Sequence, residues 1–173
     1  PKVADEKYLD SLKGIATVKN LIQPSSKIIV DASNCSSQKE MNGVHFSIIN
    51  GLGINGKGIT TMPLKRKPEP VIENASYLEY KLKLSPGKHT ITLKCLPTQS
   101  IDADKKLQFG ISVNNDPVQL MNIHSESESK EWKENVLRGY TVSKINCTIK
   151  KEETVLRIYF PEPGLAINTI EIE

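Results

Sequence analysis

Three glycines within residues 44–63 have the spacing of phosphate-binding motifs. Gly51, Gly53 and Gly56 follow an apolar run and spell G-x-G-x-x-G, and residues 51–57 also satisfy the first seven positions of the P-loop pattern G-x-x-x-x-G-K-[ST]. Both motifs bind phosphate through the free N–H groups at the start of a helix. The residues after Gly56 include a further glycine, three consecutive β-branched residues and a proline, which favour a strand over a helix. The pattern therefore predicts a glycine-rich turn between two strands, with phosphate binding as the weaker alternative.

Carboxylates that could cleave a glycosidic bond are scattered along the chain. Such cleavage usually needs two of them facing each other, about 5 to 9.5 Å apart. Most of the candidates lie in predicted loops or on the solvent-facing side of predicted strands, and they are Glu73, Glu79, Asp102, Asp104, Asp116, Glu126, Glu128, Glu131 and Glu162. The three histidines are dispersed, and no Ser/His/Asp grouping stands out. We therefore expect no catalytic residue, no metal site and no cofactor in this chain.

Sugar binding is the stronger functional candidate. A pyranose stacks its C–H face on an exposed aromatic ring, and Trp132, Tyr77 and Tyr140 are the rings that the apolar pattern does not assign to the core. Arg138 could hold the carboxylate of a glucuronate with its forked guanidinium. Each residue also has a structural interpretation: Trp132 could cap the end of the fold, Tyr77 could be a plain outward residue, and Tyr140 could anchor the start of a strand.

Apolar and polar residues alternate from residue 27 to the C-terminus. In residues 77–84, for example, every second residue from Leu78 to Leu84 is apolar and the intervening ones are mostly charged. About ten such segments follow one another at hairpin-like spacing, with turn residues between them. This pattern predicts an all-β fold in which two antiparallel sheets pack face to face. Residues 125–138 are the exception, and we expect a polar loop there with room for one helical turn.

Residues 1–26 form a separate segment. Tyr8, Leu9, Leu12 and Ile15 recur at helical spacing, and Gln23-Pro24 ends the pattern. We expect a short helical or irregular arm here, followed by one sandwich domain over residues 27–173.

Composition limits the partners. The chain has 173 residues, 25% charged residues and a net charge of +3 without a basic stripe, so we expect no nucleic-acid partner. No apolar run approaches the length of a membrane span, about 20 residues. The three cysteines lack zinc spacing, and we expect Cys95 and Cys147 to be buried thiols.

Several segments, in order, resemble the C-terminal β-sandwich domain of the glycoside hydrolase family 115 α-glucuronidases. They are residues 46–63, residues 75–80 (ASYLEY), Leu96-Pro97-Thr98, residues 107–123 (LQFGISVNNDPVQLMNI), Trp132 with Arg138, and residues 156–172 (LRIYFPEPGLAINTIEI). The resemblance covers roughly residues 28–172. One departure is Asp31-Ala32-Ser33, where family members carry an acidic residue at both ends of the triplet. A structural ion held by those acids would lack one ligand here.

The resemblance implies a jelly-roll sandwich like that of carbohydrate-binding modules. It also implies an accessory, non-catalytic role, because the catalytic residues of these enzymes lie upstream of this module. The parent enzymes remove glucuronic acid or its methyl ether from xylan, so a secreted or periplasmic location is implied. Two hypotheses remain open: an accessory domain that packs against a catalytic domain or a second copy of the chain, and an autonomous module that binds xylan or another acidic glycan.

Overall fold

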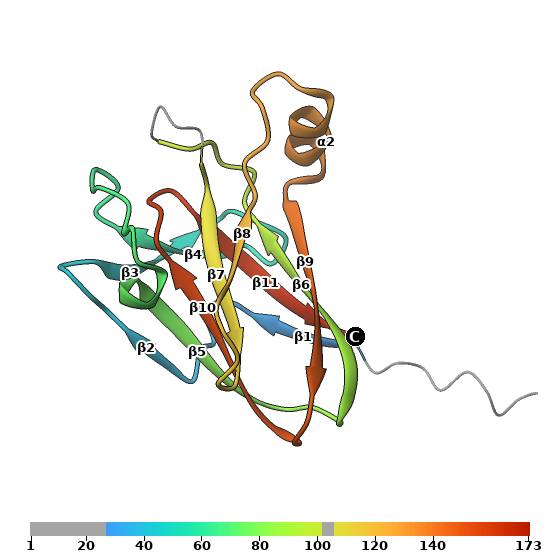
Figure 1. Ribbon diagram of the computed structural model, residues 1–173. Helices are drawn as coiled ribbons and strands as arrows, with labels where there is room; N and C mark the ends of the chain where they lie inside the picture. The colour runs from blue at the N-terminus through green and yellow to red at the C-terminus, as the bar shows by residue number, and fades with distance from the viewer. Residues whose placement is uncertain (1–26, 102–105) are drawn as a thin grey trace, which may run out of the picture.

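The chain folds into two antiparallel sheets that pack face to face (Figure 1). The computed structural model describes residues 27–101 and 106–173. The arm expected over residues 1–26 lies outside the described residues, as do Asp102 and Asp104. The predicted all-β sandwich is confirmed, while the boundary between arm and domain stays a prediction.

The first sheet has six strands in the order β3-β4-β11-β6-β9, with β1 also paired to β11. These strands are β1 (Ile28–Asp31), β3 (His45–Asn50), β4 (Lys57–Met62), β6 (Gly87–Cys95), β9 (Thr141–Ile149) and β11 (Ala166–Ile172). The second sheet has five strands in the order β2-β5-β10-β7-β8. They are β2 (Ser37–Lys39), β5 (Ser76–Lys83), β10 (Glu153–Phe160), β7 (Gln108–Val113) and β8 (Gln119–Asn122), and the short 3-10 helix η2 (Ile72–Asn74) precedes β5.

The core fills the space between the two sheets, as the alternation predicts. Tyr80, Phe109 and Phe160 are the largest of its fully buried side chains, and Leu78 and Ile158 lie beside them without exposure. Side chains two residues apart on a strand share a face, so the residues between these must point outward. Burial of apolar area on this scale is the main favourable contribution to folding.

The last strand organises the six-stranded sheet. One edge of β11 pairs with β4 through Ala166 and Ile167 and then with β1 from Thr169 onward. Its pairing with β6 on the other edge is irregular between Ile167 and Thr169. Asn168 therefore lies where two strands meet, and its side chain faces the turn between β3 and β4.

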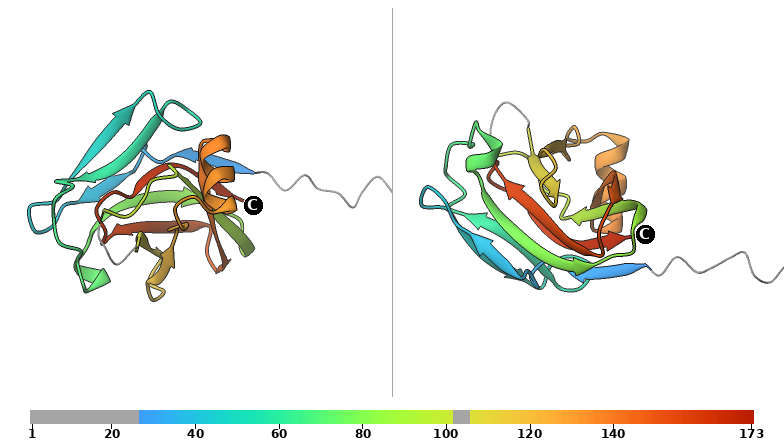
Figure 2. Two further views of the ribbon diagram at one scale, coloured as in Figure 1. Left: turned by 90° about the horizontal axis from the view of Figure 1, so that it is seen from above. Right: turned by 60° about the horizontal axis from the view of Figure 1, so that its bottom comes forward.

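Residues 125–138 contain more helix than the sequence predicts. Helix α2 (Lys130–Arg138) has nine residues and stands at one end of the sandwich (Figures 1 and 2). Ser129 caps its start by accepting the N–H of Trp132, and Gly139 ends it in the left-handed conformation. Both signals are in the sequence, but only Trp132, Val136 and Leu137 of the nine residues are apolar.

Candidate functional site

The outer face of the five-stranded sheet carries a cluster of aromatic and charged side chains. We call it the tyrosine face and define it as Lys39, Tyr77, Glu79, Arg157 and Tyr159. Tyr77 lies opposite Lys39 of β2 on one side and opposite Tyr159 of β10 on the other. Glu79 lies opposite Arg157 in the next outward row. Three neighbouring strands therefore align these residues on one surface.

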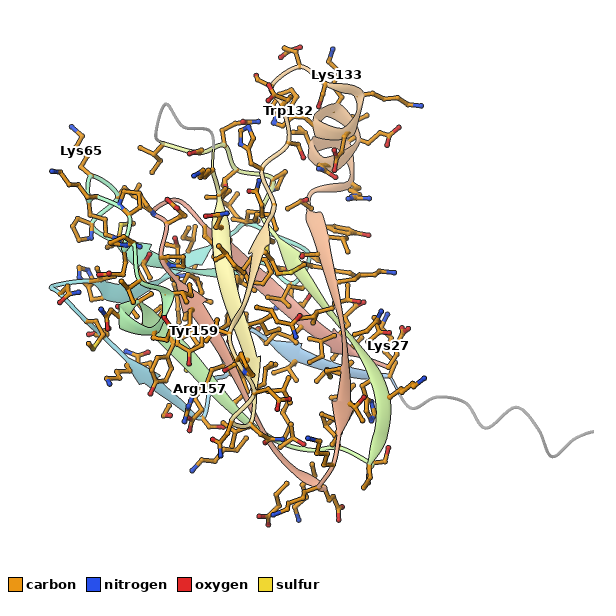
Figure 3. The ribbon with its side chains drawn as sticks, viewed as in Figure 1. Lys27, Lys65, Trp132, Lys133, Arg157 and Tyr159 are labelled. Carbon is orange, nitrogen blue, oxygen red and sulfur yellow. The ribbon has the colours of Figure 1, made fainter. Side chains whose placement is uncertain are left out.

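The side chains of the tyrosine face contact one another closely. The rings of Tyr77 and Tyr159 have centroids 5.2 Å apart at 51°, and Cζ of Arg157 lies 5.3 Å from the centroid of Tyr77. Nε of Arg157 donates to Oε2 of Glu79 at 2.8 Å, and Nζ of Lys39 lies 6.0 Å from the Tyr77 centroid. Figure 3 shows Arg157 and Tyr159 side by side on this face.

Arg157 is held in place and stays charged. The hydrogen bond with Glu79 raises the pKa of Arg157, and contact with the hydroxyl of Tyr159 acts in the same direction. A guanidinium has five N–H donors, more than these two partners can use. The Arg157 side chain is 34% exposed, whereas that of Glu79 is 13% exposed. The cation is therefore the accessible member of the pair.

A hollow continues the tyrosine face toward β7 and β8. Tyr159 lies opposite Gly110, which in turn lies opposite Leu120. Since Gly110 has no side chain, Ile72 fills that space and would lie 2.7 Å from an added Cβ. A cavity of about 270 Å³ next to it is lined by Ile72, Leu120, Gln108, Lys106 and Glu69, among others. Polar and apolar side chains thus line a cavity beside Ile72.

Trp132, which the sequence offers as a sugar platform, lies on α2. It is only partly exposed, and its Nε1 is buried with no hydrogen-bond partner among the described residues. Figure 3 places it beside Lys133 at the helix end of the molecule, far from Arg157. Its role as a platform stays a prediction.

Arg138 and Tyr140 lie together below α2. Arg138 donates from Nε to the Tyr140 carbonyl at 2.7 Å and from Nη2 to the buried Asn135 Oδ1 at 2.5 Å. Its Cζ lies 5.0 Å from the Tyr140 centroid, and Nζ of Lys94 lies at the same distance from that ring. Both residues therefore have partners within the protein, and their proposed sugar contacts stay predictions.

Tyr77 belongs to a different surface from these three residues. It lies on β5 of the five-stranded sheet, while Trp132, Arg138 and Tyr140 lie on and after α2. Sequence reasoning missed Arg157 and Tyr159 as companions of Tyr77. The signal was available, since both alternate with the core residues Leu156, Ile158 and Phe160, but the partner strand of β5 was not known.

The glycine-rich stretch forms a turn, and β4 begins directly after it at Lys57. Asn168 holds the turn in place: its Oδ1 accepts the N–H of Ile54 at 3.0 Å, and its Nδ2 donates to Asn55 and to the Lys57 carbonyl. Asn55 in turn donates to Asp31 at 2.8 Å. The turn's polar groups are thus used internally, and no helix start is present here to bind phosphate.

Apolar side chains are exposed on the same hairpin. Ile48 of β3 is 49% exposed, and Leu52 and Ile54 of the turn are 51% and 52% exposed. Figure 2 shows the hairpin projecting from the margin of the sandwich. We call Ile48, Leu52 and Ile54 the hairpin patch. Exposed apolar side chains gathered on one hairpin are a feature of surfaces that contact another part of a protein.

Arg66, the middle residue of the basic run Lys65-Arg66-Lys67 after β4, has a structural role. It donates to the carbonyls of Pro161 at 2.8 Å and Phe160 at 3.0 Å, and burial lowers the pKa of its guanidinium. Lys65 points into solvent (Figure 3).

An open cleft between the sheets offers a second polar surface. Its volume is about 790 Å³, and it is lined by His89, Cys147, Asp116 and Gln119 among other residues. Its lining has no Phe, Tyr or Trp ring on which a sugar could stack. Among the described residues, no group of three or more histidine, cysteine or carboxylate side chains could hold a metal ion. The three thiols are free, with Cys95 buried as predicted and Cys147 half-buried.

Comparison with known proteins decides the family. Residues 24–173 match the family described as "Glycosyl hydrolase family 115 C-terminal domain". The chain belongs to this family. The resemblance seen in the sequence is thereby confirmed, and the match supports a non-catalytic accessory or carbohydrate-binding role. No curated protein matches the chain in a sequence search.

Solved structures share the fold of this GH115 C-terminal domain at low identity. A GH115 4-O-methyl-α-glucuronidase, BtGH115A, superposes with a TM-score of 0.68 at 19% identity, over 84% of this chain and 17% of that chain. A family 35 carbohydrate-binding module from Clostridium thermocellum gives 0.55 at 12% identity, over 86% of this chain and 98% of the module. An exo-β-1,3-galactanase from Phanerochaete chrysosporium gives 0.57 at 14% identity, over 86% and 30%. The chain thus spans about a sixth of the length of the GH115 enzyme.

Among the described residues of this domain, no helix is long and apolar enough to cross a membrane.

Proposed function

We propose that this GH115 C-terminal domain is a non-catalytic accessory domain that packs, through the hairpin patch, against the rest of a larger glycoside hydrolase. The observation that carries the proposal is the exposure of Ile48, Leu52 and Ile54 on a hairpin whose turn is hydrogen-bonded to Asn168. Exposure of apolar side chains to water is unfavourable, so covering them stabilises the contact. A loop that already has one conformation loses little conformational entropy when a partner covers it.

The family match supports the rest of a larger protein as the occupant of this surface. The domain occupies 17% of the GH115 enzyme with which it superposes, so a large remainder is available as the partner. The same proposal takes xylan or another plant polysaccharide as the substrate of that hydrolase. It also places the protein outside the cell or in the periplasm. A second copy of the chain is the competing occupant.

Charged substitutions in the full-length hydrolase test the proposal. The double variant Leu52→Asp/Ile54→Asp places charge on the patch, while Leu137→Asp is the matched control because Leu137 is 88% exposed on α2. We expect the double variant to release the domain more rapidly in limited proteolysis, whereas the control behaves as the wild type. Equal proteolysis of all three proteins would refute the proposal, and loss of a dimer in the double variant would favour a second copy.

A further inference from the structure

We propose that the tyrosine face binds a glycan that carries uronic acid residues, with Arg157 holding the sugar carboxylate and Tyr77 packing against the sugar ring. This site is separate from the hairpin patch and does not depend on the docking role. Neither Arg157 nor Tyr159 stands among the residues that the sequence offers as a sugar site.

The cation of the tyrosine face is oriented before any ligand arrives. Glu79 accepts from Nε at 2.8 Å, and the ring of Tyr77 lies 5.3 Å from Cζ. Ser37 donates to the other carboxylate oxygen of Glu79 at 3.3 Å, so that Glu79 is itself positioned. Besides the bond to Glu79 through Nε and the contact with the Tyr159 hydroxyl, the guanidinium keeps further N–H donors for a second carboxylate, a group that arginine binds in a planar arrangement.

The charge around Arg157 favours an anionic ligand. The outward rows of β2, β5 and β10 carry four basic side chains and two acidic ones, a net charge of +2. The basic residues are Lys39, Lys81, Lys83 and Arg157, and the acidic ones are Glu79 and Glu153. Of the two carboxylates, Glu79 is used by Arg157, so an approaching anion meets mainly positive charge.

The aromatic pair distinguishes a sugar from a simple anion. Tyr159 is 7% exposed and supports Tyr77 at 5.2 Å, which fixes the outer ring in one orientation. A fixed ring offers apolar contact area at low entropic cost. A cavity of about 270 Å³ lies beyond Ile72, and Gln108, Lys106, Glu69 and Glu162 on its wall offer donors and acceptors for sugar hydroxyls.

Calorimetric titration of the chain tests the proposal. The ligand is a xylo-oligosaccharide bearing one glucuronic acid, and the matched ligand is the same compound with its carboxyl group reduced to an alcohol. We expect binding of the acidic ligand with a dissociation constant on the order of 1 mM, and at least about tenfold weaker binding of the reduced one. Sodium acetate at equal ionic strength should not compete. Equal binding of both ligands, full competition by acetate, or no heat at millimolar ligand would overturn the proposal.

Two arginine variants locate the site. Arg157→Gln removes the cation of the tyrosine face, and Arg138→Gln is the matched control because Arg138 also lies over a tyrosine, at 5.0 Å from the Tyr140 centroid. We expect at least about a tenfold loss for Arg157→Gln and no change for Arg138→Gln, provided that both variants keep the wild-type circular dichroism spectrum. A loss confined to Arg138→Gln would overturn the proposal and place the ligand near α2. Should Arg157→Gln fail to fold, Arg157→Lys is the second variant. Unchanged affinity of Arg157→Lys for the acidic ligand would contradict bidentate binding by the guanidinium.

Discussion

Asn168 of β11 accepts a hydrogen bond from the backbone N–H of Ile54 at 3.0 Å and so joins the glycine-rich turn to the last strand. The two residues are 114 positions apart in the sequence. This contact explains why a turn with three glycines has a fixed shape. It also places Leu52 and Ile54 on the outside of the turn, where the docking proposal needs them.

The geometry of the turn implies that adding a side chain lowers stability more at Gly53 than at Gly56. An alanine Cβ at Gly53 would lie 2.2 Å from Nδ2 of Asn168, and Gly53 has a φ of +80°. We expect Gly53→Ala to lower the free energy of unfolding by about 2 kcal/mol or more. Gly56 has a similar φ of +73° but open space around it, so Gly56→Ala should cost only about 1 kcal/mol. Urea denaturation measures both, and equal losses would contradict the contact with Asn168.

The hydrogen bonds of Asn135 attach helix α2 to the rest of the domain. It is 2% exposed, and its Nδ2 donates to Ser125 at 3.1 Å while its Oδ1 accepts from Arg138. Asn135→Ala leaves these partners unsatisfied, so we expect a loss of about 1 to 3 kcal/mol in urea denaturation. Glu134→Ala on the same helix is the control, because that side chain is 61% exposed and should change stability by about 0.5 kcal/mol or less.

Glu171 predicts a pH dependence of stability. Burial acts to raise its pKa, but hydrogen bonds from Lys27 and Lys94 outweigh this and leave the pKa below its ordinary value of 4.5. A carboxyl group with a lowered folded-state pKa stabilises the fold above its unfolded-state pKa. That stability is lost as the pH falls through the folded-state value. Glu171→Gln should therefore cost about 1 kcal/mol at pH 7, and this difference should shrink below about pH 4. A difference that stays constant from pH 7 to pH 3 would contradict this account.

Trp132 provides a spectroscopic test of where a ligand binds. It is the only tryptophan, and Figure 3 shows it at the opposite end of the fold from Arg157. Titration with the glucuronic-acid oligosaccharide should leave its fluorescence unchanged while calorimetry reports binding. A shift in emission that saturates with the ligand would instead favour Trp132 as the sugar platform.

The local alternation of apolar and polar residues predicted the two sheets. The tyrosine face, in contrast, depends on which distant strands pair. The alternation around Tyr80, Phe109 and Phe160 placed the core because each strand buries one face. Tyr77 could be recognised as an outward residue, yet only the pairing of β5 with β10 brings Tyr159 and Arg157 to it. The glycine spacing likewise predicted a turn at Gly51 to Gly56, but it could not show that Asn168 is hydrogen-bonded to that turn. Helix α2 was underestimated because only Trp132, Val136 and Leu137 of its nine residues are apolar, although Ser129 and Gly139 carry the end signals.

The most direct test of the accessory role is side-chain footprinting by carbene labelling of the hairpin patch. Leu52 and Ile54 are labelled in this chain alone and in the full-length protein, with Leu137 as the internal reference. We predict several-fold lower labelling of Leu52 and Ile54 in the full-length protein, relative to Leu137. Equal labelling of these residues in both proteins would contradict docking through the hairpin.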